Sequence, residues 1–387
     1  MGTPVEFTNV RLADPRFEGL IDASDNERAR IVARFEAKFQ AVMARIYAGA
    51  GRDEVFETWR AVSAPDMEET DRRIAAAATS ASDAAIVESA AADLDLSACA
   101  RQDFGPSDPP GKGDCVDLVF CFDANFTGHF GPTLLSVTQN TDRPLRVHLI
   151  CRGIRPSMVE EYAAVFPNVS FILYDVTQIS YGDVKLLAHI SLSTMDRLVS
   201  PELLGGIDRA VYLDVDILVR GDVGELADFA LDGALIAARD SIHAEWNSGR
   251  MLVYEVARRY DPEKANRFRA FMFDGGQVEF VSYNAGVLVM DLAGLRADQF
   301  STKAVAWARE FELHDQFILN IYTRENRADL PPSWNHFATQ ELIDDPNLVH
   351  FIGTIKPWTD NRRHPFDLEW LACREAYLKK CAEITSG

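Results

Sequence analysis

After residue 115 the chain alternates short apolar runs with segments of helical character, and this alternation constrains the fold more than any other feature. Strand-like runs lie at residues 116–122, 145–151 and 169–175. Helices are predicted in the later part of TGHFGPTLLSVTQNT, between the first two runs, and near residues 156–165. Short apolar strands separated by helices are typical of a mostly parallel sheet with helices on its faces. We therefore predict an α/β fold.

The first hundred residues follow a different pattern. The segment ASDNERARIVARFEAKFQAVMARIYAGAG opens with the capping-box spacing Ser24-x-x-Glu27 and continues with apolar residues at helical spacing. The segment RQDFGPSDPPGKGD at residues 101–114 concentrates Pro, Gly and Asp, as linkers do. We predict an all-helical N-terminal extension and linker at residues 1–105 and an α/β domain at residues 106–387. The extension either stabilises the domain or binds an acceptor or partner, and the sequence favours neither.

Charge and composition exclude several classes of partner. The chain of 387 residues has 59 acidic and 39 basic residues, a formal charge of −20, and no Lys/Arg-dense tract, so it repels nucleic acid and anionic membranes. No apolar run approaches the ~20 residues that span a bilayer, and the N-terminus lacks a signal-peptide pattern. The six cysteines show no C-x-x-C spacing and are expected to be free thiols. We expect a cytoplasmic protein without a transmembrane segment that does not bind nucleic acid.

The run VYLDVDILVR at residues 211–220 carries two carboxylates in an otherwise apolar, β-branched context. If the run is one strand, Asp214 and Asp216 project from the same face with their Cα atoms about 7 Å apart. Two like charges there repel, so the pair requires a cation between them or an open strand end. Paired oxygens are ligands that Mg²⁺ and Mn²⁺ prefer, and these ions also bridge substrate phosphates. Alone, the pair fits a cation site and a solvated strand end equally.

Other polar residues stand where apolar runs begin or end. Each of them alone is consistent with a structural role, such as an Asx turn or a partner for a helix dipole. An imidazole could complete a metal set with two carboxylates, and a lysine could supply a cation to a phosphate. The patterns G-x-x-x-x-G-K-[ST] and G-x-G-x-x-G are absent, which disfavours a P-loop enzyme and a Rossmann dehydrogenase. The residues are Asp123 and Asn125 in FCFDANF, Asn284 before VLVMDL, Asp315 and Gln316 in LHDQFILN, and His350, Gly353 and Lys356 in LVHFIGTIKPW.

Taken in order, six motifs resemble those of glycosyltransferase family 8, most closely its bacterial lipooligosaccharide α-galactosyltransferase branch. The resemblance covers residues 117–360. It implies a GT-A fold, in which a D-x-D motif ends a strand of a nucleotide-binding sheet. It also implies a retaining hexosyltransferase that uses UDP-galactose or UDP-glucose, Mn²⁺ (or Mg²⁺) and a saccharide acceptor. The motifs are FCFDANF, HISLSTMDRL, VYLDVDILV, YNAGVLVMDL, HDQFILN and HFIGTIKPW.

The resemblance implies roles for individual residues. The Mn²⁺ ligands would be Asp214, Asp216 and His350. The acceptor cleft would begin at His189. The candidate catalytic residues would be Arg197, Asp315, Gln316 and Lys356. The donor-binding residues would be Asp123, Asn125, Phe126 and Ile190 for the nucleotide, Gly353 and Lys356 for the diphosphate, and Arg197, Asn284, Asp315 and Gln316 around the sugar.

Several alternatives remain at this point. The segment REAYLKKCAEITSG lacks the long basic, aromatic tail by which lipooligosaccharide enzymes dock on membranes. A soluble or protein acceptor is therefore as consistent as a bacterial surface glycan or lipooligosaccharide reached by peripheral recruitment to the inner face of the membrane. Ala124 also stands where an acidic residue is common in this branch.

Two other functions are disfavoured. An inactive UDP-sugar-binding scaffold would be expected to have lost a motif residue, and a sugar-1-phosphate nucleotidyltransferase would have a basic Gly-rich loop after its first strand. Retention is compatible with double displacement through Asp315 or Gln316, but front-face attack assisted by the leaving phosphate is favoured because glutamine is a poor nucleophile.

Overall fold

The computed structural model describes residues 94–386, together with residues 41 and 61. Within 94–386 the gaps are residues 185, 187–190, 242–248, 250–251, 254–255, 257–258, 275–279, 339–342 and 360–363. The chain divides into two compact units, Met1–Ser80 with Val253–Asp274 and Ala81–Leu252 with Gly275–Gly387. The first contains helix α10 (Pro262–Asp274), and the second contains every other element below. Apart from residue 41, the predicted helix that begins at Ser24 lies outside the described residues.

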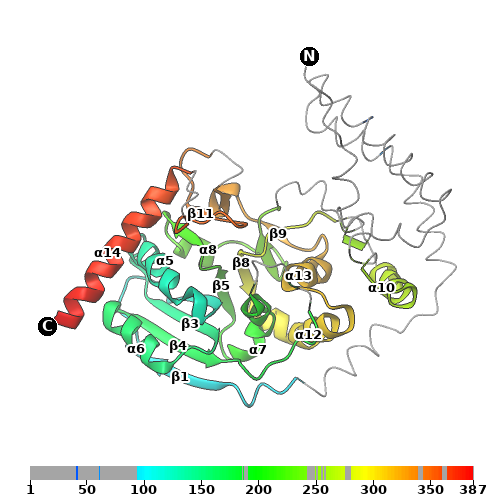
Figure 1. Cartoon of the computed structure of the whole chain (residues 1–387), viewed down its shortest axis with the longest axis horizontal. Coiled ribbons are helices and arrows are strands. Elements are labelled where there is room, and N and C mark those ends of the chain that lie inside the picture. The colour runs from blue at the N-terminus through cyan, green and yellow to red at the C-terminus, as the bar shows by residue number, and fades with distance from the viewer. Residues whose placement is uncertain are drawn as a thin grey trace. The chain divides into compact units, whose positions relative to one another are not determined.

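The larger unit is built on an eight-stranded sheet with the order β1-β4-β3-β2-β5-β8-β7-β9 (Figure 1). Strands β2, β3, β4, β5, β7 and β9 run in one direction, and β1 and β8 run in the opposite one. The predicted α/β fold with a mostly parallel sheet is therefore confirmed. The strands are β1 (Ala100–Phe104), β2 (Val116–Asp123), β3 (Leu145–Arg152), β4 (Val169–Asp175), β5 (Arg209–Leu213), β7 (Ile236–Ala238), β8 (Val287–Asp291) and β9 (Ala328–Asp329).

Helices flank the sheet. Helices α5 and α6 lie beside the strands β2, β3 and β4, and α14 packs along α5 (Figure 1). The 3₁₀ segment η3 contacts β2 and β3. The helix predicted near residues 156–165 is confirmed as α6. The helical elements are η2 (Ala124–Phe126), α5 (Thr127–Gln139), α6 (Pro156–Val165), η3 (Leu192–Val199), α7 (Ser200–Leu203), α8 (Gly224–Ala227), α11 (Leu292–Ala297), α12 (Phe300–Phe311), α13 (Asp315–Thr323), η5 (Pro332–Trp334) and α14 (Phe366–Ser386).

The two faces of strand β3 differ in chemistry. Val147 and Leu149 are fully buried in the same apolar cluster as Phe130 of α5. Because side chains alternate along a strand, Arg146 and His148 project from the opposite face. The sheet therefore has an apolar face under α5 and α6 and a face that is polar along β3.

Two segments differ from the sequence prediction. Residues 101–104 were placed in a linker, but they lie within β1, which pairs antiparallel with β4 at the sheet edge. The run at residues 211–220 is not one strand, and the D-x-D motif follows the end of a strand, as the resemblance implies. Strand β5 ends at Leu213, and the chain turns before β6 (Ile217–Val219), which joins a second sheet of order β10-β11-β6. The other strands of this sheet are β10 (His336–Phe337) and β11 (Leu348–His350).

Helix α5 fixes the start of this second sheet through buried hydroxyl groups. Thr133 Oγ1 donates to the carbonyl oxygens of Val215 (2.7 Å) and Ile217 (3.2 Å). Ser136 Oγ accepts a hydrogen bond from the Val219 amide (3.0 Å). Because Val215 stands between Asp214 and Asp216, these bonds hold the backbone that carries both carboxylates.

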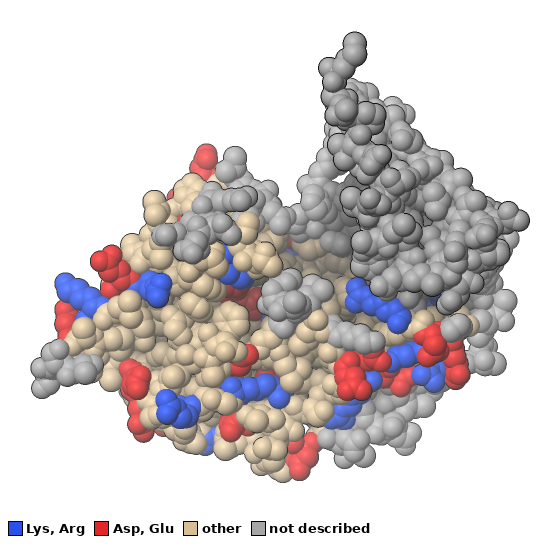
Figure 2. Space-filling model, in the orientation of Figure 1, with Lys and Arg blue, Asp and Glu red and all other residues tan. Residues whose placement is uncertain are grey.

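Charges of both signs are spread over the described surface. On the face shown in Figure 2, Lys and Arg side chains are interspersed with Asp and Glu, and the described residues show no continuous basic patch there. Within the part of the chain that the structure describes, no helix combines the length and the apolar character needed to cross a membrane. The longest described helix, α14, carries charged residues along its length.

We expect Thr133→Val to lower the free energy of unfolding by about 1–3 kcal/mol, because the buried carbonyls lose their donor while the side-chain volume is kept. Thr133→Ser retains the hydroxyl and should cost less. Urea denaturation of the three proteins measures this difference. Equal stabilities of Thr133→Val and the wild type would contradict the anchoring role.

Candidate metal and nucleotide site

Asp214 and Asp216 lie on the turn between the two sheets. The Asp214 amide donates to the Gly286 carbonyl (2.8 Å), just before β8 begins. The Phe351 amide, just after β11, donates to the Asp216 carbonyl (3.0 Å). The turn is therefore anchored at both ends to backbone from distant parts of the sequence.

The two carboxylates face His350 at the end of β11. His350 Nε2 lies 3.6 Å from Asp214 Oδ2 and 3.4 Å from Asp216 Oδ1. One ligand atom from each of the three residues lies within 4.8 Å of the others. Both nitrogen–oxygen distances exceed the usual ~2.7–3.2 Å of a hydrogen bond. Oxygen and nitrogen donors that converge without bonding to one another suit a divalent cation.

A chain of side-chain amides sets the tautomer of His350. The backbone N–H of Gly286 donates to Asn284 Oδ1 (3.0 Å). The atom of the Asn284 side chain at this position is therefore the oxygen and not the nitrogen. Asn335 Nδ2 donates to the same oxygen (3.0 Å), so Asn335 Oδ1 faces His350 Nδ1 at 2.9 Å. Nδ1 then carries the proton, and the lone pair of Nε2 points to the carboxylates. This is the tautomer that a metal ligand requires.

The remaining carboxylate oxygens are held by cations. Lys356 Nζ bonds to Asp216 Oδ2 and to the Phe351 carbonyl (2.6 Å). Burial acts to raise the pKa of Asp216, but the ammonium group of Lys356 holds that pKa well below its ordinary value, so Asp216 is ionised. Asp214 Oδ1 accepts from Tyr212 Oη (2.6 Å) and Arg197 Nη2 (3.0 Å). Its Oδ2 is left facing His350.

Arg197 links the metal ligands to helix α13. Its side chain is only 3% exposed, and its Nε lies 3.1 Å from Asp315 Oδ2. Its Nη1 donates to the Ala285 carbonyl, and its guanidinium lies 4.2 Å from the centre of the Tyr212 ring. Burial acts to lower the pKa of Arg197, but neighbouring Tyr212, Asp214 and Asp315 raise it, so the group stays charged. In the structure Arg197 is committed to protein groups.

The first turn of α13 contacts the backbone before β8. Asp315 is buried, and its Oδ1 accepts from Thr194 Oγ1 (3.0 Å). Gln316 Oε1 accepts from the Ala285 amide (3.1 Å). The prediction that both residues lie in a first helical turn is confirmed. They lie together with Arg197 and Asn284.

The predicted nucleotide-binding turn follows β2. Asp123 Oδ1 accepts from the Asn125 amide (2.9 Å), and Oδ2 accepts from Ser191 Oγ. Asp123 thereby closes the turn and ties it to the start of η3. Asn125 is exposed and Phe126 is half-buried. Ile190 and His189 lie outside the described residues.

An aromatic stack joins this region to the Lys356 loop. His129 of α5 stacks on Trp358 with ring centroids 3.8 Å apart and ring planes at 12°. Trp358 also contacts Trp370 of α14 (5.0 Å). Burial, followed by the positive charge of Arg374, lowers the pKa of His129 to about 4. The loop that carries Gly353 and Lys356 is therefore packed between α5 and α14.

Sequence reasoning missed three residues of this site. Asn335 sits in PPSWNHF without a recognisable pattern, and Tyr212 looks like an ordinary strand aromatic. His129 lies in the helix after FCFDANF, where a lone histidine carries no signal. Each acts on partners that are adjacent mainly in the fold, although Tyr212 and Asp214 are two residues apart and bond to each other.

Comparison with known proteins gives consistent matches. The family model described as Glycosyl transferase family 8 matches residues 117–362. General stress protein A of Bacillus subtilis (strain 168) is 24% identical over 289 residues, which cover 67% of this chain and 93% of that protein. The lipopolysaccharide 1,2-glucosyltransferase of Escherichia coli (strain K12) is 22% identical over 267 residues, which cover 63% of this chain and 73% of that protein.

Solved structures show the same fold. The galactosyltransferase LgtC, in complex with donor and acceptor sugar analogues, matches with a TM-score of 0.55 and 20% identity, covering 67% of this chain and 96% of that one. The apo structure of the bifunctional glycosyltransferase WbbM matches with a TM-score of 0.53 and 19% identity, covering 72% and 53%. The predicted GT-A fold is confirmed.

We expect the wild type to lose stability as the pH falls from about 6.5 towards 4, in part through His129. Its folded-state pKa is depressed, so the unfolded chain takes up a proton that the folded chain refuses. His129→Phe keeps an aromatic ring against Trp358 but does not titrate, so it should lose less stability over this window. Urea denaturation at several pH values measures the difference.

His129→Ala is the matched control, because it removes both the stack and the titration. It should be less stable than His129→Phe at every pH. Identical pH profiles for the wild type and His129→Phe would show that this histidine does not contribute.

Proposed function

Because the chain belongs to glycosyltransferase family 8, we propose that it transfers a hexose, galactose or glucose, from a UDP-sugar to an acceptor hydroxyl with retention of configuration. One observation carries the proposal. Ligand atoms of Asp214, Asp216 and His350 lie within 4.8 Å of one another, with Lys356 bonded to the outer oxygen of Asp216. Two carboxylate oxygens and an imidazole nitrogen fit Mn²⁺, with Mg²⁺ as the alternative.

The charge of the departing diphosphate is the main chemical problem at such a site. A bound divalent cation would neutralise part of that charge. The ammonium group of Lys356 lies next to the proposed ligands and can donate hydrogen bonds to diphosphate oxygens. Gly353 has a φ of +74° and nothing near the position of a Cβ atom, so the backbone there is open to a ligand. These features support a diphosphate-binding role for the loop.

The surroundings of Asp315 support front-face attack. A nucleophile for double displacement needs a free carboxylate, whereas Asp315 is buried and bonded to Arg197 and Thr194. In front-face attack, the acceptor oxygen bonds to the anomeric carbon as the bond to UDP breaks on the same side. The hydroxyl proton passes to an oxygen of the leaving phosphate. Asp315 then serves to hold Arg197.

This mechanism leaves no covalent sugar on the protein. We expect the mass of the intact protein to be unchanged after incubation with Mn²⁺ and UDP-galactose or UDP-glucose without acceptor. A hexose adduct located on Asp315 by peptide mapping would establish double displacement instead.

We propose a saccharide acceptor of the bacterial surface-glycan or lipooligosaccharide type. The name of the Escherichia coli relative, a lipopolysaccharide glucosyltransferase, supports this class. Transfer of labelled hexose to a panel of oligosaccharide acceptors tests it. Transfer only to protein acceptors would contradict it.

We expect UDP release from UDP-galactose or UDP-glucose to require Mn²⁺ and to stop with a chelator. Asp214→Asn and Asp216→Asn should each lower turnover at least about 100-fold, because a neutral amide is a poor ligand for a hard cation. Calorimetric titration with Mn²⁺ in the presence of UDP should show the same loss of binding.

Asp345→Asn is the matched control. Its carboxylate is 90% exposed and pairs with Arg220 at the surface. It should keep wild-type turnover. Chelator-insensitive turnover, or full activity of both site variants, would overturn the proposed metal site.

A further inference from the structure

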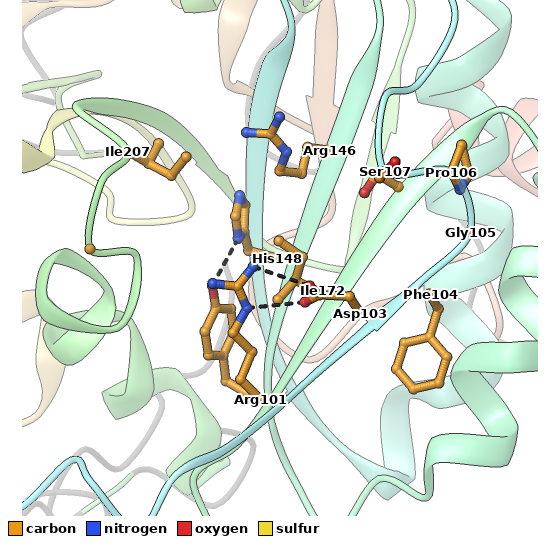
Figure 3. A pocket seen from close by; sticks show the side chains of 13 residues that line it. Arg101, Asp103, Phe104, Gly105, Pro106, Ser107, Arg146, His148, Ile172 and Ile207 are labelled. Atoms are coloured by element: carbon orange, nitrogen blue, oxygen red, sulfur yellow. Dashed lines mark hydrogen bonds and ion pairs between the residues drawn. The ribbon is translucent and has the colours of Figure 1, made fainter.

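A cavity of about 290 Å³ opens beside the polar side chains of β3 (Figure 3). Its walls come from β1 and the residues after it, from β3 and β4, and from the loop after α7. None of Asp214, Asp216, His350 and Lys356 lines it. The cavity is therefore distinct from the metal and nucleotide site.

The floor of the cavity is a buried hydrogen-bonded chain. His148 is 1% exposed, with Nε2 2.8 Å from Asp117 Oδ1 and Nδ1 3.4 Å from Tyr174 Oη. Burial lowers the pKa of His148, so the ring is neutral. The N–H at Nε2 donates to the Asp117 carboxylate, and Nδ1 accepts from the Tyr174 hydroxyl. The same Asp117 oxygen accepts from Arg146 Nη1 (3.2 Å), which fixes that guanidinium at the cavity.

Two guanidinium groups at the cavity have more N–H donors than their bonds to carboxylates use. Arg146 uses one N–H on Asp117, and Arg101 uses Nε and Nη2 on Asp103 (3.0 and 3.3 Å). A guanidinium has five N–H donors, so both can bond to a ligand as well. The side chains of Arg101 and Asp103 are 54% and 64% exposed, and ion pairs this exposed to solvent are weak. A ligand can therefore rearrange this pair at little cost. Figure 3 shows the two guanidinium groups on either side of His148.

The lining combines cations with acceptors and hydroxyls. Two arginines and one aspartate line the cavity, and Asp117 at its floor pairs with Arg146, so these four charges balance before a ligand binds. Ser107 and Ser170 add hydroxyl groups. A phosphoryl group offers enough oxygens for both guanidinium groups, which bind phosphate through paired N–H donors. The Asp103 carboxylate instead suits a ligand with hydroxyl donors.

We propose that this cavity binds a phosphorylated saccharide, with the phosphate on Arg101 and Arg146 and the sugar hydroxyls towards Asp103 and the serines. The volume is at the lower end of small-molecule pockets, about 300–1,000 Å³, and fits a single hexose phosphate. Gly105 lines the cavity with a φ of +75°, and a Cβ there would lie 2.5 Å from the Val169 carbonyl oxygen. Glycine at this position lets β1 end close to β4.

The test is calorimetric titration of the full chain with glucose 6-phosphate, glucose and inorganic phosphate. We expect glucose 6-phosphate to bind more tightly than either fragment. The double variant Arg101→Gln/Arg146→Gln should weaken binding at least tenfold, and Arg101→Gln alone at least threefold. Arg155→Gln removes the same charge from an exposed position outside the cavity lining, and it should bind as the wild type does.

Lys356→Gln separates this cavity from the diphosphate site. Binding of glucose 6-phosphate should survive this change. Binding lost in Lys356→Gln but kept in Arg101→Gln would overturn the proposal, as would equal binding of glucose and glucose 6-phosphate. Thermal midpoints check folding, and Arg101→Gln provides the test if the double variant does not fold.

Discussion

The site depends on holding like-charged groups together. Two carboxylate oxygens and an imidazole lone pair converge at Asp214, Asp216 and His350. In a partly buried site this arrangement is costly unless each charge has a partner. Arg197 donates to Asp214 Oδ1, and Lys356 donates to Asp216 Oδ2. The other oxygen of each carboxylate therefore remains directed at His350. Arg197 also holds a third carboxylate at the start of α13, so these groups sum to one negative charge. A divalent cation would change that sum to one positive charge, which attracts a diphosphate.

Gly286 serves this arrangement in three ways. Its carbonyl oxygen accepts a hydrogen bond from the Asp214 amide. Its own N–H donates to Asn284 and so orients the side-chain amides that lead to His350. It also has no side chain. A Cβ there would collide with the His350 ring and lie 2.7 Å from Asp214 Oδ2. Only a residue without a side chain fits between these groups. In the structure the close approach is between glycine and the proposed metal ligands.

The limits of sequence reasoning here follow from the range of the interactions. Strands β2, β3 and β4 and helix α6 were predicted because their patterns depend on neighbouring residues. The division of the run at 211–220 between two sheets could not be predicted, because its apolar character is the same for one sheet as for two. In the structure its first part pairs with β8 and its last part pairs with β11, and both strands lie far along the chain. Asn335 was missed for the same reason, since its partners Asn284 and His350 lie in other elements.

The cations of this protein differ in how free they are to meet a ligand. Arg197 is 3% exposed and bonded to two carboxylates and two carbonyls, so replacing its partners would leave buried charges unpaired. Lys356 is 17% exposed and shares one carboxylate with the proposed metal site. Arg101, which is half-exposed, has only a weak partner two residues away. Burial and partner strength therefore rank Arg197 as a structural cation, Lys356 as a group that can serve both protein and substrate, and Arg101 as the most available.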